Sequence, residues 1–311
     1  MLTLKENIPL ARYSNYKIGG PARYFCEPNN AEEVIEAVKW AKGKKLPMFI
    51  LGGGTNILFD EEGFRGLVLK PNLCGLSHEG TAVRAGAGVL MAGLLDFAAG
   101  RGLEGLEWAG GLPGTLGGAI RGNAGCFGGE IKDRVTEVTS LDISGRTPRV
   151  VTRENRACRF EYRNSVFKRR DGKEVILGAK FALHSGDKEA IRKAIEEKIR
   201  YRGERHPMDY PNIGSMFKNV PLKEVPAARR KELAHIVKTD PFPVVPTAYL
   251  IAQAELRGVS CGGAMISPKH PNFIVNVLNA EPAHVRALVA LAKKEVKKKF
   301  SVELEEEVII F

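Results

Sequence analysis

The chain has 311 residues, of which 44% are hydrophobic, so it can bury a sizeable core and divide into two or three domains. Its formal net charge of +11 fits polyanionic partners such as nucleic acid, a membrane surface or phosphate-rich small ligands. The five cysteines are odd in number, widely spaced and form no CxxC or Cys/His pattern, so neither a disulfide framework nor a zinc site is indicated.

The first predicted elements form a small α/β unit. Ala22–Glu27 is a predicted strand, and Asn30 is a good helix cap with Glu33 three residues later in capping-box position. Met48–Leu51 and Leu67–Lys70 are further predicted strands, and a glycine-rich run follows the first of them directly.

The remaining elements are predicted in chain order. The middle of the chain has strands at Val83–Ala85, Val135–Ile143 and Val175–Leu183, and helices at Leu90–Ala99 and from Asp187 to about Arg202. The RHPMDYP stretch at Arg205–Pro211 predicts a hinge into a last domain. That domain has helices near Thr247–Glu255 and Pro282–Phe300, a strand at Phe273–Leu278 and the strand-like ending VELEEEVIIF.

Three glycine-rich segments are the strongest functional signal: LGGGTNIL at 51–58, AGAG at 85–88 and AGGLPGTLGGAIRGNAG at 109–125. Glycine leaves the backbone bare, so successive N–H groups can turn together onto an anionic ligand. Ordinary turn chemistry explains any one segment, but the three together favour a cradle for a large phosphorylated cofactor. A dinucleotide-binding Rossmann fingerprint is unsupported, because its third glycine would fall at Ile57 or Met91, and no P-loop motif occurs.

Four polar clusters could carry chemistry. FEYRNSVF at 160–167 contains Tyr162 and Arg163, and PNIGSMFKN at 211–219 contains Ser215. SPKHPNFIVN spans 267–276, and LEEEV spans 304–308. Taken individually, each is better explained as a surface arginine, a helix cap, a turn histidine or a solvated carboxylate.

In their order along the chain, these segments resemble the MurB family of UDP-N-acetylenolpyruvoylglucosamine reductases, in its shorter form. With KIGGPA and LRGVSCGGAMISPKHPNFIVN, the resemblance runs from about Lys17 to Val308. It implies an α+β FAD-binding fold of the vanillyl-alcohol-oxidase type, with two FAD-binding subdomains and a C-terminal α/β substrate-binding domain. The implied boundaries are 1–77, with the C-terminal strand 301–311 returning to it, then 78–205 and 206–300.

The resemblance also implies a reaction. NADPH reduces non-covalently bound FAD, and the flavin passes hydride to the enolpyruvyl group of UDP-N-acetylglucosamine enolpyruvate, giving UDP-N-acetylmuramate for peptidoglycan synthesis, cell shape and cell division. Arg163 would polarise the substrate carboxylate, Ser215 would supply the proton, and Glu307 would stabilise the enolic form.

The same resemblance assigns binding residues. Substrate contacts would come from Tyr162, Lys218, Asn219 and His270. The FAD contacts would come from Leu51, Gly52, Gly53, Gly54, Thr55, Asn56, Ala87, Gly88, Gly111, Pro113, Gly114, Thr115, Gly117, Gly118, Asn123, Ala124 and Gly125.

The chain departs from the family pattern at several positions. His270, Pro271 and Asn272 replace the usual HAN, and proline removes a backbone donor. Glu255 stands where the family commonly has glycine, and the stretch 240–246 is looser than expected. Cys126 lies in a glycine segment, where a covalent cofactor link is conceivable, but family behaviour favours non-covalent FAD.

Two alternatives remain. Another FAD enzyme of the same superfamily would leave YRNS, GSxFKN and LEEEV unexplained, and a basic nucleotide- or RNA-binding module would be colourless and bind nucleic acid in a salt-sensitive way. The basic clusters lack interleaved aromatic residues, so no nucleic-acid partner is expected. The N-terminus has no apolar signal core and no run approaches a membrane span, so we expect a cytoplasmic protein without a membrane partner. We expect a monomer as well, a state that no pattern in the sequence sets.

Overall fold

The computed structural model describes residues 2–239 and 242–311. The chain divides into two compact units, each built from separate stretches of sequence. The first unit comprises Met1–Ile8, Pro21–Gly53 and Phe64–Arg202, and the second comprises Pro9–Gly20, Gly54–Gly63 and Gly203–Phe311. The predicted three-part division at 77/78 and 205/206 stays a prediction.

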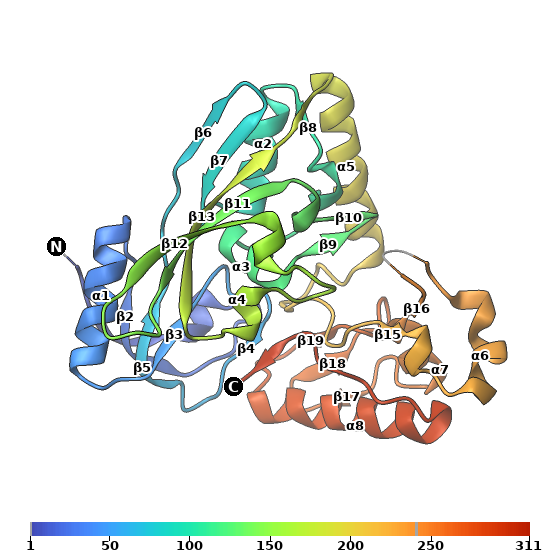
Figure 1. The fold of residues 1–311 in the computed structure, drawn as a ribbon. Coiled ribbons are helices and arrows are strands. Elements are labelled where there is room, and N and C mark those ends of the chain that lie inside the picture. The colour runs from blue at the N-terminus through green and yellow to red at the C-terminus, as the bar shows by residue number, and fades with distance from the viewer. Residues whose placement is uncertain (1, 240–241) are drawn as a thin grey trace. The chain divides into compact units, whose positions relative to one another are not determined.

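A small mixed sheet with one helix opens the first unit (Figure 1). Its strand order is β1 (Lys5–Pro9), β2 (Pro21–Cys26), β5 (Phe64–Leu69) and β3 (Met48–Ile50), with β2 and β3 both parallel to β5. Helix α1 (Ala31–Gly43) buries Val34, Ala37, Val38 and Ala41 in one core with residues of β2 and β5. Its start was predicted correctly, because the Asn30 side chain accepts the N–H of Glu33 at 2.8 Å.

A larger antiparallel sheet forms the rest of the first unit, with the order β12, β11, β13, β7 and β6. Its core draws on the sheet and on the helices beside it. The strands are β6 (Leu76–Glu79), β7 (Ala82–Gly86), β11 (Val135–Asp142), β12 (Arg149–Glu154) and β13 (Glu174–Ala182), and the helices are α2 (Met91–Ala99), α3 (Leu116–Gly122), α4 (Val166–Arg169) and α5 (Lys188–Arg205). Short pairs β8 (Leu103–Glu104) with β14 (His184–Ser185), and β9 (Gly125–Cys126) with β10 (Gly129–Glu130), lie at its edges.

The second unit is built around the long helix α8 (Pro282–Phe300), which contacts the small antiparallel sheet β17 (Ser260–Cys261), β18 (Ala264–Ile266) and β19 (Ile274–Asn276) (Figure 1). Tyr16, from far earlier in the chain, is fully buried in this core and donates its hydroxyl to the carbonyl of Ile274 at 2.8 Å. The other elements are α6 (Ala227–Leu233), α7 (Thr247–Gln253), the pair β15 (Val220–Pro221) and β16 (Val244–Val245), and the parallel pair β4 (Ile57–Leu58) and β20 (Ile309–Ile310).

The predicted elements are largely confirmed, with three differences. The third glycine segment is not loop throughout, since it contains α3, which was not predicted. The strand-like C-terminal ending shrinks to Ile309–Ile310, because residues 302–305 have no regular structure and Glu306 forms only an isolated bridge. Strands β1, β6, β12, β17 and β18, helices α4 and α6 and most of the two-residue strands were also missed.

Candidate active site

The first and third glycine segments meet at backbone contact in the first unit. A Cβ placed on Gly53 would lie 2.6 Å from the Cα of Gly114, and one on Gly52 would lie 2.8 Å from the Oγ1 of Thr115. Real Cβ atoms essentially never approach other heavy atoms this closely, so only glycine fits at position 53 without moving the backbone of 114.

The second glycine segment joins the same cluster. The carbonyl of Ala87 accepts the N–H of Gly117 at 2.9 Å, and the carbonyl of Val89 accepts the N–H of Leu116 at 2.8 Å. Ala87 and Gly88 donate their own N–H groups to the carbonyls of Leu177 and Leu73. These two predicted cofactor residues therefore also build the scaffold that carries α3.

The arrangement fits a large anionic cofactor. The N–H groups of Gly52, Gly53, Gly114 and Thr115 donate to no other residue within the described part of the chain. Unpartnered N–H groups on bare, partly exposed glycine backbone are the donors that phosphate oxygens accept from. A side chain at Gly53 would fill the space where the two segments approach.

The other predicted cofactor residues of the third segment divide between surface and core. Gly111, Pro113 and Gly118 are exposed. Asn123 is fully buried in the left-handed conformation that ends α3, and its side chain bonds within the protein, donating to the carbonyl of Glu161 and accepting from the N–H of Lys132. Ala124 and Gly125, which follow it, are half-buried.

The segment LGGGTNIL also supplies residues to the second unit, which begins again at Gly54. Gly54 has a φ of +64°, and a Cβ there would lie 1.8 Å from the carbonyl oxygen of Tyr13. Two residues later, Asn56 donates its side-chain amide to the carbonyl of Glu307 at 3.1 Å and accepts the N–H of Ile309 at 3.0 Å. The end of this glycine segment thus holds the chain beside Glu307.

Arg163 occupies a strained turn in the first unit. Glu161 and Asn164 exchange two backbone hydrogen bonds of 3.0 Å each, and Arg163 between them has a φ of +53°. Such a turn normally takes glycine or asparagine at this position, so a charged side chain there is unusual. Its Nη2 donates to the carbonyl of Gly125 at 2.8 Å, and its guanidinium lies 5.0 Å from the ring centroid of Tyr162.

Ser215 and Glu307 are brought together by one short ladder in the second unit. The N–H of Glu307 donates to the carbonyl of Met216 at 2.9 Å, and the N–H of Lys218 donates to the carbonyl of Glu305 at 3.0 Å. Both Ser215 and Glu307 are half-buried. No residue in the described part of the chain hydrogen-bonds the Ser215 hydroxyl, which leaves it available to a ligand.

The two predicted substrate residues beside this ladder are fixed by other residues of the second unit. The Lys218 ammonium forms an ion pair with Glu305, and the backbone carbonyl of Lys218 accepts a hydrogen bond from the Thr247 hydroxyl at 2.5 Å. The Asn219 side chain accepts the N–H of Thr247 at 3.2 Å, at the first residue of α7. Both side chains are half-buried, so part of each faces solvent.

His270 is held in an aromatic cluster of the second unit. Its ring lies 4.8 Å from that of Phe273 and 5.3 Å from that of His206. Its buried Nδ1 bonds to no residue among those described. Burial, with smaller contributions from the positive charges of Lys238 and Arg257, lowers the pKa of His270 to about 4, so the imidazole is neutral at pH 7.

Sequence reasoning missed Asn272, which is buried and fixes the Ser215 segment. The N–H of Phe217 donates to its Oδ1 at 3.0 Å, its Nδ2 donates to the carbonyl of Phe217 at 2.8 Å, and its own carbonyl accepts the N–H of Met216 at 2.7 Å. The polar run leading into β19 was the available signal. Pro271 lacks a backbone N–H, but no bond to the Ser215 segment is lost, because Asn272 forms all three of the bonds described here.

Cys126, the residue considered for a covalent cofactor link, lies in the first unit, and its sulfur hydrogen-bonds other residues of the protein. The thiol donates to the carbonyl of Trp108 at 3.2 Å, and the Nη2 of Arg202 donates to the sulfur at 2.9 Å. No group of three potential metal ligands occurs among the residues that the structure describes. Nor is any helix within them long and apolar enough to cross a bilayer.

The chain is similar to known proteins over nearly its whole length. Residues 206–311 match the family model of the C-terminal domain of UDP-N-acetylenolpyruvoylglucosamine reductase, and residues 22–150 match that of an FAD binding domain. The reductase of Caldanaerobacter subterraneus is 37% identical over 98% of this chain and 92% of its own length, and that of Carboxydothermus hydrogenoformans is 38% identical over 96% and 91%. The crystal structure of the Thermus caldophilus reductase (MurB) is 26% identical, with a TM-score of 0.77 over the full length of both chains.

Proposed function

We propose that this chain, which belongs to the UDP-N-acetylenolpyruvoylglucosamine reductase family and is an FAD-dependent oxidoreductase, uses NADPH to reduce the enolpyruvyl group of UDP-N-acetylglucosamine enolpyruvate. The product is UDP-N-acetylmuramate, a precursor of peptidoglycan. When bound, FAD supplies a two-electron carrier that takes hydride from the nicotinamide and delivers it to the alkene.

The chemistry of the acceptor sets what the protein must provide. Hydride arrives at the terminal carbon of the enolpyruvyl group, and negative charge develops on the adjacent carbon and the carboxylate. Fixed positive charge at the carboxylate stabilises that charge, and a proton must reach the adjacent carbon. Arg163, Ser215 and Glu307 supply these functions in the proposed reaction.

Arg163 is suited to hold the carboxylate. A guanidinium carries five N–H donors in a planar fork that matches a carboxylate, and the bond from Nη2 to the Gly125 carbonyl fixes the plane of this one. Because the Arg163 backbone is held in a strained turn, the side chain is positioned before the substrate arrives.

Ser215 would protonate the adjacent carbon, with Glu307 stabilising the enolic form. A serine hydroxyl is a weak acid in water, so its donation requires partial desolvation and a fixed direction. The observation that carries this assignment is the ladder that sets Glu307 opposite Met216, the residue next to Ser215, together with a serine hydroxyl that is unpartnered among the described residues.

The remaining assignments concern binding. Lys218, Asn219, Tyr162 and His270 contact the substrate in this proposal, and the glycine cluster at 52–53 and 114–115 holds the FAD phosphates without a covalent bond. The net charge of +11 would favour capture of three phosphorylated ligands, the substrate, NADPH and FAD. We further propose that the protein acts as a cytoplasmic monomer, which a light-scattering mass near 34.0 kDa would support.

The test is the visible spectrum of the purified protein under anaerobic conditions, with NADPH added first and the UDP-linked enolpyruvyl sugar second. We expect bleaching of the flavin on the first addition and recovery of its absorbance on the second. Bleaching without recovery would contradict the substrate and favour another oxidoreductase of this fold. Bleaching by NADH as fast as by NADPH would contradict the choice of reductant.

A further inference from the structure

We propose that Lys168 is a positioning residue that fixes Arg163 for the carboxylate of the substrate, an inference that rests on the function proposed above. The Nζ of Lys168 donates to the carbonyl oxygen of Arg163 at 3.0 Å. Its ammonium therefore binds the backbone of the one residue in the turn that has a positive φ.

The bond matters because the left-handed conformation is costly for arginine. A non-glycine residue there costs roughly 1–2 kcal/mol and persists only where the surroundings impose it. A hydrogen bond from a charged donor contributes about 1.5–3 kcal/mol, which is enough to offset that cost. Lys168 thereby stabilises the conformation that directs the Arg163 side chain toward Gly125.

The turn is also tied to the end of α3, in the third glycine segment. Ser165 donates its hydroxyl to the carbonyl of Arg121 at 2.7 Å, and Asn123 donates its amide to the carbonyl of Glu161 at 3.1 Å. Together with the bond from Arg163 to Gly125, three alternate residues of the segment 121–125 each form a hydrogen bond with one of three alternate residues of the segment 161–165. The loop that carries the cofactor donors and the proposed carboxylate-binding residue are thus parts of one rigid element.

Lys168 can act in this way because the helix that carries it is fixed at both ends. Helix α4 is a single turn, too short to be stable alone. Buried Ser165 caps its start by accepting the N–H of Lys168 at 3.3 Å. Just after its end, Arg170 forms an ion pair with Glu174, whose side chain is 0% exposed and is also paired with Arg153.

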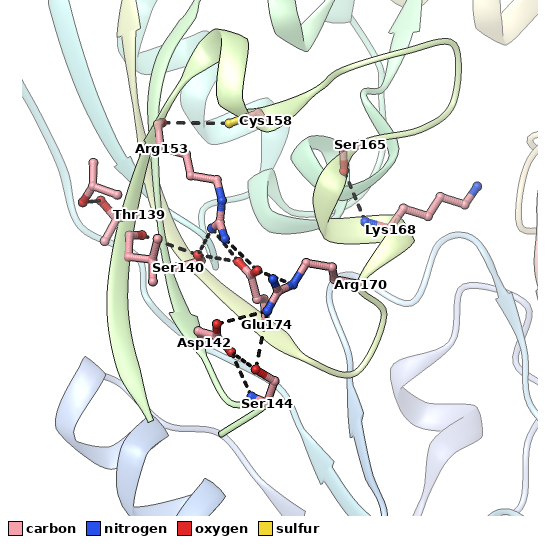
Figure 2. Close-up of polar contacts among 12 residues, drawn as sticks. Thr139, Ser140, Asp142, Ser144, Arg153, Cys158, Ser165, Lys168, Arg170 and Glu174 are labelled. Atoms are coloured by element: carbon pink, nitrogen blue, oxygen red, sulfur yellow. Dashed lines mark hydrogen bonds and ion pairs between the residues drawn. The ribbon is translucent and has the colours of Figure 1, made fainter. Parts of the chain in front are cut away.

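Figure 2 shows that the two basic side chains in and just after α4 point in different directions: Arg170 extends toward Glu174, whereas Lys168 extends away from it. The ammonium is thereby kept apart from the buried carboxylate that takes both arginines. Replacing Lys168 by methionine removes the ammonium but keeps the backbone N–H that Ser165 caps, so α4 retains its start.

The first test is structural and does not depend on the reaction. Crystal structures of the FAD-bound wild type and of Lys168→Met should show that the variant loses the bond from Arg163 to the Gly125 carbonyl and that Arg163 leaves the left-handed region. An unchanged Arg163 in the variant would overturn the proposal, whatever the substrate of the enzyme.

The second test separates the half-reactions. In Lys168→Met we expect reoxidation of reduced flavin by the enolpyruvyl substrate to slow about 10- to 100-fold, while reduction by NADPH, FAD content and melting temperature match those of the wild type. Lys168→Arg should restore most of the rate, and Lys173→Met, which removes an equal charge from an exposed side chain nearby, should change nothing. Loss of FAD or equal slowing of both half-reactions would show a merely structural role and overturn the proposal.

A double-mutant cycle identifies the residue through which Lys168 acts. In an Arg163→Met background, Lys168→Met should slow reoxidation less than twofold further, because the group it positions is gone. Multiplicative slowing would overturn the proposal. If the wild type itself is not reoxidised by this substrate, the proposed function fails, and the crystal structures still decide the role of Lys168.

Discussion

Asn272 and Phe217 exchange two hydrogen bonds, one from the Phe217 N–H to the Asn272 Oδ1 and one from the Asn272 Nδ2 to the Phe217 carbonyl. A side-chain amide here replaces the neighbouring strand that would otherwise pair with this residue. Both residues are buried, so neither backbone group can turn to water instead. The position of Ser215, two residues earlier, therefore depends on an amide 55 residues away in sequence.

Asn272→Ala should lower the free energy of unfolding by about 2–5 kcal/mol, because it leaves a buried N–H and a buried carbonyl without partners. Asn272→Asp buries a carboxylate and sets one of its oxygens against the Phe217 carbonyl, so its loss should be at least as large. Chemical denaturation measures both. Asn29→Ala removes an exposed amide and is the matched control, with an expected change under about 0.5 kcal/mol. Equal stability of Asn272→Ala and the wild type would show that the two bonds contribute nothing.

Ser215→Ala should retain flavin reduction by NADPH and lose roughly 10²–10⁴ in the rate of reoxidation by the enolpyruvyl substrate, the usual contribution of a general acid. The variant keeps the backbone of the ladder, since the bonds of Met216 and Glu307 use only main-chain atoms. Stopped-flow absorbance follows the two half-reactions separately. Equal damage to both would rule out a proton-donor role.

Glu255→Gly should raise the free energy of unfolding by about 1 kcal/mol. Glu255 has a φ of +61° directly after α7, where its N–H donates to the carbonyl of Ala252 and the N–H of Leu256 donates to that of Ile251. This is the Schellman helix ending, which usually takes glycine at that position. The family preference for glycine thus has a conformational cause, and this chain carries the strain instead.

Glu255→Ala provides the control for that gain, because it removes the same side chain without freeing φ. Alanine should give no comparable increase in the denaturation midpoint. A gain shared equally by both variants would mean that the carboxylate, and not the backbone conformation, causes the strain.

The pKa of His270, lowered to about 4, makes stability depend on pH. Below about pH 6.5 the unfolded chain binds a proton that the folded chain does not, so the free energy of unfolding falls as pH drops from about 6.5 to about 4. The loss from this one group reaches roughly 3 kcal/mol near pH 4.

His270→Gln tests that dependence. Carboxylates titrate over part of the same range, so the informative quantity is the difference between the wild type and the variant. The difference should be flat above about pH 7 and should change steadily below about pH 6.5. Parallel curves for the two proteins would mean that His270 titrates normally.

The sequence predicted helices whose ends carry local signals. Helix α8 was predicted with the correct bounds, since Pro282 suits the first helical turn and the apolar residues follow helical spacing. Helix α3 was missed because LGGAIRG is rich in the residue least suited to helices after proline. At Gly117 a Cβ would lie 3.1 Å from the Cβ of Ala87, so a larger residue there would require Ala87 to move slightly.

The sequence predicted which residues are candidates for the site, but not how the fold positions them. Motif order identified Arg163, Ser215 and Glu307 as candidates, and the structure brings Ser215 and Glu307 together through the ladder at Met216. Nothing local in the sequence indicates that arginine adopts a left-handed turn at 163, because such turns are recognised by glycine or asparagine. Contacts such as Asn272 with Phe217 join distant segments and have no local signature.

The interleaving of the two units along the chain constrains how the protein is made. Tyr16, Ile18 and Leu58 belong to a core whose other buried residues all lie beyond 212. During synthesis these early side chains leave the ribosome long before α8, and the pairing of β4 with β20 must wait for the final residues. The second unit therefore completes its core only after α8 and β20 have been synthesised, so a chain stalled before residue 282 would carry two early apolar segments with nothing to bury them.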